Sequence, residues 1–330
     1  MIYLESSSFN PYFNLALEQF VFDELGKKEN CFMLWQNDNS IIIGKNQNTV
    51  EEINASFVKE NKINVARRLS GGGAVYHDLG NLNFTFVSNA ANADKLDLQF
   101  FCKPIAAALS TLGVQAEISG RNDITIEGKK FSGNAQYIKD GRIMHHGTIM
   151  FSSNLDTVMQ ALNVSGDKIV SKGFKSIRSR VTNVSEHIKN PITLLEFKNI
   201  LLDFILKEEK FDVYKLKDAD IDGINKLKDE KYATWDWNYG KSPEYSIKKK
   251  RKVENSGIIE ICMQTAEGGI ITDMKIYGDF FGIKDVDSLG ALFIGKKANE
   301  ENYKSVLSQV KTGDYINNLS NEQFLEILAQ

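Results

Sequence analysis

Three adjacent glycines stand at the centre of the stretch Arg67-Arg68-Leu69-Ser70-Gly71-Gly72-Gly73-Ala74-Val75-Tyr76-His77-Asp78. They leave no side chain between the backbone and a bound molecule, and they permit positive φ, so that successive N–H groups can converge on one point. Convergent N–H donors beside two arginines are typical of a receptor for phosphate or carboxylate. A flexible turn between strands is the alternative, but one or two glycines would suffice for it. The stretch therefore predicts an anion site.

The bulk composition is that of a globular protein of about two domains. The chain has 330 residues, of which 42% are hydrophobic and 25% charged, and its formal net charge is −3. A net charge of this sign provides no basic field to gather nucleic acid, and no apolar run approaches the ~20 residues that span a bilayer. We therefore expect neither a nucleic-acid nor a membrane partner.

The N-terminus and the cysteines both indicate a cytoplasmic protein. Residues 1–5 lack the cationic and apolar segments of a signal peptide. The three cysteines, Cys31, Cys102 and Cys262, are odd in number and far apart, which favours neither a disulfide framework nor a zinc site. None of them lies in a glycine-rich or histidine-adjacent stretch of sequence, so we expect them to act as small hydrophobic residues.

Apolar periodicity and capping patterns predict many short elements in the first 240 residues. Helices are expected over 10–25, from 49 onward, and over 100–112, 155–162, 193–207 and 220–232. Strands are expected over 31–35, 41–43, 64–67, 82–87, 115–118, 124–127 and 144–151. The helices interrupt the strands irregularly, whereas a doubly wound parallel sheet alternates more strictly. The fold class is therefore α+β, with a mixed or antiparallel sheet.

A second, smaller domain is expected near the C-terminus. The predicted boundary is Tyr239-Gly240-Lys241-Ser242-Pro243 and the following charge run, Lys248 to Lys252, which we interpret as a solvated linker. Two strands, 257–265 and 269–277, and three helices, around 287–293, 299–310 and 320–328, follow it. The prediction is a catalytic domain over 1–245 and a small α+β accessory domain over 246–330.

The lysine pair Lys129-Lys130 is the first candidate for chemistry. Such a pair between strands is usually a solvated hairpin tip, but the following Phe131-Ser132-Gly133 favours one lysine that points inward. A compact ammonium group suits phosphoryl or adenylyl chemistry. Upstream, Asp123 offers a carboxylate for Mg²⁺, and a role in stabilising its own turn is an equally open alternative.

The histidines give weaker signals. His145-His146 has no third ligand nearby, which excludes a zinc site, and adjacent residues of a strand point to opposite faces, so at most one histidine faces a given pocket. His77-Asp78 is a candidate acid–base pair. A hydrolase triad with Ser70 is disfavoured because no Gly-x-Ser-x-Gly elbow exists. Walker and dinucleotide-binding fingerprints are also absent, so a bound nucleotide would use another scaffold.

Several blocks together resemble the lipoate-protein ligase A family, in the biotin/lipoyl ligase superfamily. The blocks are 67–81, Gly120-Arg121-Asn122-Asp123, Lys130-Phe131-Ser132-Gly133-Asn134-Ala135, His145-His146-Gly147-Thr148, 176–183, and the segments 13–18 and 235–240. They occur in the family's order over nearly the whole chain, and the Arg-Arg-x-Ser-Gly-Gly-Gly-Ala-Val block is highly specific. The family also carries a small C-terminal domain, which matches the unit expected after the charge run.

The resemblance implies a two-step ligase that uses ATP, Mg²⁺ and lipoate. Lipoate would be activated to lipoyl-AMP, and the acyl group would then pass to a lysine of an apo lipoyl-domain protein, an E2 subunit of a 2-oxoacid dehydrogenase or the glycine-cleavage H protein. Lys130 would be the catalytic residue and Asp123 the Mg²⁺ contact. The implied adenylate site comprises Gly71, Gly72, Gly73, Ala74, Val75, Tyr76, His77, Asn81, Asp123 and Lys130. The implied lipoate site comprises Leu17, Glu18, Trp35, Arg68, Ser70, Gly73, His77, His146, Gly147 and Thr148.

The cationic, polar loop 168–183 is a further hypothesis. Its composition suggests a lid over the intermediate, with Arg178 and Arg180 available to the phosphate.

Two other functions stay open at this point. One is an acyltransferase of the same fold that moves octanoyl or lipoyl groups through a cysteine thioester without ATP. The other is a non-catalytic protein that binds lipoate or an adenylate, although such a protein would have no need of Lys130. Transfer without ATP would establish the acyltransferase, and loss of activity in Cys102→Ala would locate its cysteine. Release of pyrophosphate on addition of lipoate and ATP would distinguish a ligase from a non-catalytic binder.

Overall fold

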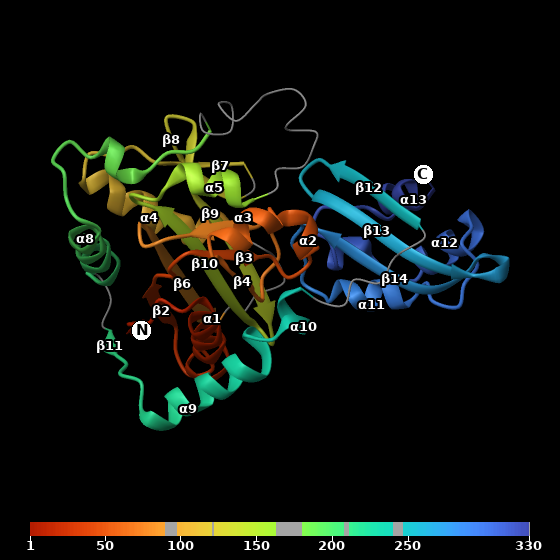
Figure 1. Ribbon diagram of the computed structural model, residues 1–330, viewed down its shortest axis with the longest axis horizontal. Coiled ribbons are helices and arrows are strands. Elements are labelled where there is room, and N and C mark those ends of the chain that lie inside the picture. Colours follow the sequence, from red (N-terminus) through yellow and green to blue (C-terminus); the bar gives the residue numbers. More distant parts are fainter. Residues whose placement is uncertain (90–97, 121, 163–179, 208–210, 240–246, 330) are drawn as a thin grey trace. The chain divides into compact units, whose positions relative to one another are not determined.

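The computed structural model describes residues 1–330 except 90–97, 121, 163–179, 208–210, 240–246 and 330 (Figure 1). The described chain divides into two compact units. The first unit comprises Met1–Ile43, Val50–Arg68 and Val75–Asn238. The second comprises Gly44–Thr49, Leu69–Ala74 and Tyr239–Gln330. The greater part of the predicted lid therefore lies outside the described residues.

An eight-stranded mixed sheet is the centre of the first unit. Its strands, in spatial order, are β11 (Asp212–Val213), β1 (Ile2–Glu5), β2 (Cys31–Trp35), β6 (Asn81–Asn89), β10 (Arg142–Met150), β9 (Lys129–Lys139), β8 (Asp123–Ile126) and β7 (Glu117–Ser119). The pairs β11–β1 and β1–β2 are parallel, and the others are antiparallel. This arrangement confirms the mixed sheet expected from the sequence.

The register of the central strands sorts their side chains onto two faces. One row across β2, β6, β10 and β9 consists of Met33, Thr85, His146 and Ala135. The next row consists of Leu34, Phe84, Gly147 and Asn134. Successive residues of a strand point to opposite faces, so the two rows lie on opposite sides of the sheet. We call them the site face and the core face, because the second row packs into the main apolar core, which includes Phe84 and Phe131.

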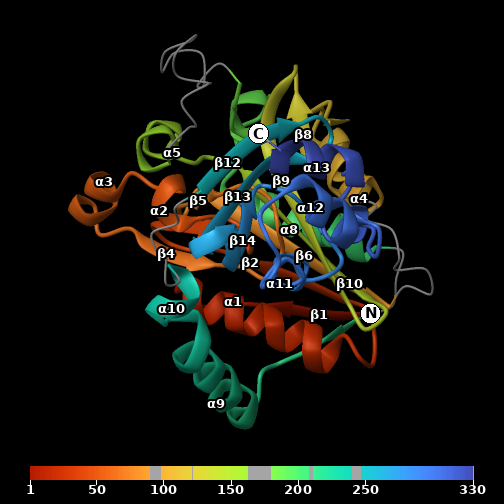
Figure 2. The ribbon, with the colours of Figure 1, turned by 90° about the vertical axis from the view of Figure 1, so that its right-hand side faces the viewer.

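Each face is in contact with a different helix. α1 (Pro11–Phe20) begins where Asn10 accepts hydrogen bonds from the N–H groups of Tyr12 and Phe13, as the sequence predicts, and continues as a π-helical turn over Val21–Leu25. Glu18 of α1 reaches the site face, whereas Cys102 of α4 (Leu98–Thr111) reaches the core face. α9 (Asp218–Leu227) lies beside α1 in Figures 1 and 2.

The remaining α-helices of this unit are short, except for α8 with its 13 residues. They are α2 (Thr49–Glu52), α3 (Ala55–Glu60), α5 (Leu155–Ala161), α8 (Leu194–Leu206) and α10 (Trp235–Asn238). The helix predicted from Thr49 is a single turn, because Ile53 leaves helical geometry to form a β-bridge with Leu162. The predicted capping box of Thr193 and Glu196 is confirmed at the start of α8. No helix within the described residues is long and apolar enough to cross a membrane.

A small sheet accompanies the large one in the first unit. Its order is β4 (Asn64–Arg67), β3 (Ser40–Ile43) and β5 (Val75–His77), with β3 parallel to β4 and antiparallel to β5. Its three strands end or begin at the glycine stretch and at the turn after Ile43.

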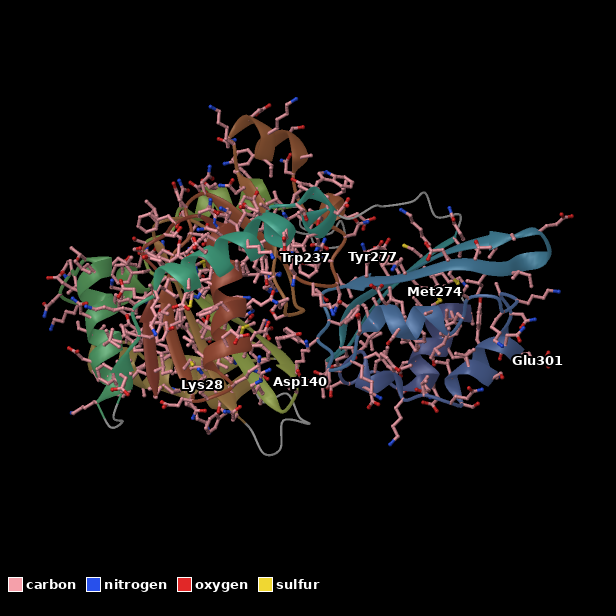
Figure 3. The ribbon with its side chains drawn as sticks, turned by 90° about the horizontal axis from the view of Figure 1, so that it is seen from below. Lys28, Asp140, Trp237, Met274, Tyr277 and Glu301 are labelled. Carbon is pink, nitrogen blue, oxygen red and sulfur yellow. The ribbon has the colours of Figure 1, made fainter. Side chains whose placement is uncertain are left out.

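The second unit is an α+β sandwich with its own core. A three-stranded antiparallel sheet, β12 (Ile247–Val253), β13 (Gly257–Ala266) and β14 (Ile270–Gly278), has helices against one face (Figure 3). The helices are α11 (Val286–Ala291), α12 (Glu300–Leu307) and α13 (Asn321–Ala329). Phe280, Phe293 and Phe324 are fully buried at the centre.

The interpretation of Lys248–Lys252 as a linker is wrong, because these residues form the edge strand β12. Their exposure alternates along the strand: Lys248, Lys250 and Lys252 are exposed, while Lys249 and Arg251 are half-buried and bond to α13. Lysines on an edge strand keep it from pairing with other chains. The composition suggested a solvated segment, because five consecutive cationic residues gave no sign of the alternating exposure of a strand.

Candidate active site

Lys130 lies on the site face and is paired with Asp123. Its Nζ is 2.7 Å from Asp123 Oδ1, and the two side chains are 34% and 37% exposed. A β-bulge gives Lys130 this direction. Thr125 of β8 pairs with Lys130 while its neighbour Ile124 pairs with Ser132, so Phe131 is an extra residue on β9. Because a bulge breaks the alternation of a strand, Lys130 shares a face with Gly133, although the two residues are three positions apart.

Gly133 and Thr148 complete the immediate surroundings of the lysine. The Gly133 N–H donates to Thr148 Oγ1 at 3.2 Å. A Cβ at Gly133 would lie 3.0 Å from Lys130 Nζ, so the absence of a side chain leaves room for the ammonium group. The predicted residues Lys130, Asp123 and Thr148 are thus brought together on one sheet face.

A buried hydrogen-bonded chain continues along the same face from Trp35 to His146. Trp35 Nε1 donates to Thr85 Oγ1 at 2.9 Å, and Thr85 Oγ1 donates to Glu18 Oε1 at 2.7 Å. The same Glu18 oxygen lies 2.8 Å from His146 Nδ1. Three residues expected at the lipoate site therefore form one network with Thr85, which the sequence did not single out.

His77 presents a donor with no partner. Asn37 Oδ1 accepts from Asn14, so the Asn37 amide nitrogen is the group that donates to His77 Nδ1, at 3.1 Å. Nε2 then carries the proton, and it has no hydrogen-bond partner among the described residues. Burial, with help from Arg68 and His146, lowers the pKa of His77 to about 3. The imidazole is therefore neutral at physiological pH and offers one N–H to a ligand.

The two arginines before the glycines differ in role. Arg68 is buried, and its guanidinium donates to the Ile42 carbonyl at 3.1 Å. Burial lowers its pKa to about 10, which keeps it charged at neutral pH, and the nearby Glu18 carboxylate opposes that shift. Arg67 instead donates to the carbonyls of Trp237 and Asn238 (Figure 3 labels Trp237). The expected pair of anion-binding arginines is therefore reduced to Arg68.

The triple glycine belongs to the second unit, and part of its function there is structural. The Gly72 N–H donates to the Phe280 carbonyl at 3.2 Å, and Gly72 has a φ of 93°. A Cβ at Gly71 would lie 2.3 Å from the same carbonyl oxygen, whereas one at Gly73 would meet nothing within 4 Å. The backbone approached by Gly71 is thus that of Phe280, and Gly73 is the glycine beside open space.

The other residues expected at the adenylate site have individual roles. Tyr76 Oη donates to Asn39 at 3.0 Å, and Asn81 Nδ2 donates to Asn83 at 2.9 Å. Val75 is half-buried, as is Ala74 beside it in the second unit. Arg180 is exposed, and its carbonyl accepts from the Lys130 N–H at 2.8 Å. Arg178 lies outside the described residues.

The remaining lipoate-site predictions divide by face and unit. Leu17 is buried in α1. Ser70, in the second unit, is buried and its carbonyl accepts from the Lys45 N–H at 2.8 Å. Gly147 lies on the core face, where a Cβ would be 2.2 Å from Asn134 Oδ1. The absence of a side chain at Gly147 therefore makes room for Asn134.

The candidate acid–base pair His77-Asp78 is not formed. Asp78 accepts from the N–H groups of Gly80 and Asn154, at 3.0 and 2.7 Å. Its carboxylate therefore stabilises a turn, and the expected catalytic dyad is wrong.

The premise that no cysteine lies beside a histidine is also wrong in three dimensions. Cys102 Sγ is 4.0 Å from His145 Nε2, and both side chains are buried on the core face. The proximity was invisible in the sequence because α4 and β10 lie more than thirty residues apart, and only the packing of the helix on the sheet joins them.

A protein-only metal site is not present within the described ranges. They contain no group of three or more His, Cys, Asp or Glu side chains that could hold a metal. Asp123 is a single carboxylate already paired with Lys130. The donor set thus does not fit a resident Mg²⁺ centre.

Thr85, Asn83 and Asn134 are the polar residues that sequence reasoning missed. All three are buried. The available signal was a polar residue inside an otherwise apolar strand, as at Asn83 and Thr85 of β6. In β9 the same signal was present, but polar residues and Gly133 were so frequent that the strand itself was not predicted.

The fold and this sheet face define a class of protein: an α+β domain with a lysine–carboxylate pair on one face of a mixed sheet, followed by a separate α+β unit. The family model of the lipoyl protein ligase A/B catalytic domain matches residues 10–206, and that of the bacterial lipoate protein ligase C-terminus matches residues 242–328. The chain is 44% identical to lipoate-protein ligase LplJ of Bacillus subtilis, covering 99% of this chain and 100% of the relative. It is 42% identical to lipoate–protein ligase 1 of Staphylococcus aureus, covering 97% of each.

Solved structures agree. The structure of Plasmodium falciparum LipL1 in complex with lipoate matches with a TM-score of 0.82 and 28% identity, covering 100% of this chain and 99% of that one. A lipoate-protein ligase A bound with ATP matches with a TM-score of 0.59 and 27% identity, covering 72% of this chain and 98% of that one. The chain belongs to the lipoyl protein ligase A/B family and is a ligase.

Proposed function

We propose that this protein is an ATP-dependent lipoate–protein ligase that works in two steps. In the first, a lipoate carboxylate oxygen bonds to the α-phosphorus of ATP, the bond from that phosphorus to the bridging oxygen breaks, and pyrophosphate leaves. In the second, the amine of an acceptor lysine attacks the acyl carbon, AMP leaves, and the amine gives up a proton. Family membership and the pairing of Lys130 with Asp123 on the site face support this proposal.

Lys130 is the residue we assign to charge stabilisation. Negative charge develops on the α-phosphate oxygens during adenylation, and a donor already in place avoids reorganisation at that moment. Asp123 holds the ammonium group before substrate arrives. Lys130 and its carboxylate partner therefore favour a preorganised anion receptor over a solvated lysine.

The buried network from Trp35 to His146 is assigned to lipoate. Burial of the aliphatic chain contributes ~0.8 kcal/mol per CH₂ group, and the apolar surface of Trp35 suits it. The Nε2–H of His77, which has no partner in the part of the chain that the structure describes, and the charged Arg68 would supply polar contacts. Water is best excluded here, because lipoyl-adenylate is hydrolysed by it.

Magnesium is proposed only as the counterion that arrives with ATP. The Asp123–Lys130 pair does not fit a resident centre, so no step above depends on a metal held by the protein. Mg²⁺ in nucleotide sites keeps several waters and is held largely by the phosphates.

The acceptors we propose are lipoyl-domain proteins, namely E2 subunits and the glycine-cleavage H protein, in the cytoplasm. The resemblance implies them, and one similar solved structure is described as a bipartite lipoate protein ligase from Thermoplasma acidophilum with its E2 lipoyl domain. We also propose a catalytic domain over 1–245 and an accessory domain over 246–330, which agrees with the start of the second matched family model at residue 242.

The test is mass spectrometry of an apo lipoyl domain after incubation with lipoate, ATP and Mg²⁺, together with an assay of pyrophosphate release. Lys130→Ala is expected to lower kcat for adenylation by about 10²-fold or more, because one charge-stabilising donor is lost. Lys129→Ala is the matched control, since that lysine is exposed and points to the other face. Full turnover by Lys130→Ala would refute the assignment.

One observation favours a second candidate, the ATP-independent acyltransferase. Cys102 and His145 have the residue types of a thiol–imidazole pair. Both are buried on the core face, away from the face that carries Lys130. Acyl transfer without ATP that is lost in Cys102→Ser would support this candidate. A non-catalytic binder would release no pyrophosphate at all.

A further inference from the structure

We propose that Asn134 is a positioning residue for Lys130: it fixes the turn that carries Asp123 and thereby fixes the place of the lysine ammonium group. The inference rests on the proposed function of Lys130. It concerns a residue on the core face, which has no contact with the ammonium group and acts through the backbone.

Asn134 and Asn122 clasp each other by three hydrogen bonds. The Asn134 N–H and side-chain amide both donate to the Asn122 carbonyl, at 2.9 and 3.2 Å. In return the Asn122 side-chain amide donates to the Asn134 carbonyl at 2.9 Å. Asn122 immediately precedes Asp123, so this clasp sets the position from which the Asp123 carboxylate extends to Lys130.

The side chain of Asn134 is itself held on three sides. Its Oδ1 lies 3.3 Å from His145 Nε2, and its amide donates to Ser132 Oγ at 3.2 Å. The His145 ring is stacked against Phe84 and Phe101, with centroids 5.9 and 5.1 Å away. The missing side chain of Gly147 provides the space. The anchor of the clasp is therefore a packed part of the core.

The Lys130–Asp123 pair needs such an anchor. Both side chains are about one-third exposed, and exposed ion pairs stabilise a geometry by only about 0–1 kcal/mol. A lysine has four rotatable bonds, so a weak pair alone leaves its Nζ mobile. Holding the backbone of Asp123 restricts one partner and so narrows the positions of the other. Errors of about 1 Å at a reacting centre can lower a rate by about 10²-fold.

The experiment measures kcat and KM for pyrophosphate release in the full-length protein. We expect Asn134→Ala to lower kcat by about 10- to 100-fold, with the KM for lipoate changed by less than about threefold. Gln136→Ala is the matched control, because Gln136 is also a buried amide on the core face and also bonds to His145, at 3.2 Å, but lies two positions further along β9 than the residue that bonds Asn122. We expect its kcat to stay within about threefold of the unsubstituted protein.

A double-mutant cycle distinguishes positioning from general loosening of the core. If Asn134 acts through Asp123, Asn134→Ala in an Asp123→Ala background lowers kcat little further, because the effects of coupled residues are not additive. Additive effects, or equal losses in Asn134→Ala and Gln136→Ala, would overturn the proposal. If Asn134→Ala does not fold, Asn122→Ala, at a half-buried turn, removes the hydrogen bond from the Asn122 amide to the Asn134 main-chain carbonyl and is expected to show the same coupling.

Failure of this inference differs from failure of the proposed function. If Lys130→Ala retains full activity, the proposed function of Lys130 is wrong whatever Asn134 does. If Lys130→Ala is inactive while Asn134→Ala and Asn122→Ala are unimpaired, only the positioning role of Asn134 is wrong.

Discussion

The Thr85 hydroxyl shows how one small residue organises a site. It accepts from Trp35 and donates to Glu18, so its single oxygen links a strand, a neighbouring strand and a helix. Thr85→Val keeps the shape but leaves the indole N–H unpaired, and an unsatisfied buried group costs about 1–3 kcal/mol. We expect the free energy of unfolding, measured with denaturant, to fall by that amount, and the KM for lipoate to rise.

Thr85→Ser is the control for this prediction, because it retains the hydroxyl and removes only a methyl group. It should keep the KM for lipoate near that of the unsubstituted protein. An equal rise of KM in both variants would mean that packing, not the hydrogen bonds, is responsible.

The buried His77 predicts an acid-sensitive fold. Its pKa is lowered to about 3 from an ordinary value of 6.5, chiefly by burial. Below pH 6.5 the unfolded chain takes up a proton that the folded chain does not, so the free energy of unfolding falls as pH decreases toward 3. The slope from this group is at most about 1.4 kcal/mol per pH unit.

His77→Gln should remove that contribution. Denaturant unfolding between pH 4 and 7 tests this. As the pH falls, the free energy of unfolding of the unsubstituted protein should decrease faster than that of the variant. His145, whose pKa burial also lowers well below its ordinary value, contributes equally to both proteins and cancels. Parallel curves would contradict the prediction.

At the scale of elements, the glycine turn makes two different predictions within the second unit. Gly71→Ala would place a Cβ 2.3 Å from the Phe280 carbonyl, so we expect a lower melting temperature because backbone must shift. Gly73→Ala meets nothing within 4 Å and should fold normally. If the adenylate lies against Gly73, the second variant should lose ATP affinity, measured calorimetrically, without losing stability. The reverse pattern would contradict this division.

The sequence predicted most elements, and the exceptions have physical reasons. The apolar run Cys31–Trp35 is a strand at the predicted position, because a buried strand needs continuous apolar residues. β9 was missed because Lys130, Gly133 and Asn134 interrupt the alternation of apolar and polar residues that is typical of a strand. β12 was mistaken for a linker because charge concealed its alternation.

The candidate site was less predictable than the strands. Lys130, Asp123, His146 and Trp35 followed from motifs, and the structure brings each to the site face or its network. Thr85 and Asn134 did not, because their roles depend on register and on which helix covers which face. A sequence read without homologues carries no information on either.

At the scale of the molecule, the catalytic unit is closed by its far C-terminal end. Asn238 accepts from the Arg67 N–H at 2.8 Å across 171 positions of sequence, and its amide donates to the carbonyls of Tyr232 and Thr234. Trp237 Nε1 donates to the Arg67 carbonyl. The matched catalytic family model ends at residue 206, so these contacts lie beyond it while still belonging to the first unit.

We therefore expect Asn238→Ala to destabilise the protein by about 1–3 kcal/mol, since a buried backbone donor loses its acceptor. Asn61→Ala is the control and should change stability far less, because Asn61 is exposed and its side-chain amide donates to the Phe57 carbonyl one turn earlier. Denaturant unfolding measures the stability of both variants. Equal effects would show that the closure contributes little.

The extra residue in β9 has a consequence for how this chain tolerates length changes. Lys130 pairs with Thr125 and Ser132 pairs with Ile124, so Phe131 is the residue that β9 has in excess. Without it, Lys130 would stand two positions from Gly133 on a regular strand and would still face the same side. Removal of residue 131 is therefore expected to keep the direction of the ammonium group and to reduce stability, because a fully buried core side chain is lost. Removal of Ser132 as well would leave Lys130 adjacent to Gly133 and turn the lysine to the opposite face, so two deleted codons are expected to abolish catalysis where one mainly weakens the fold.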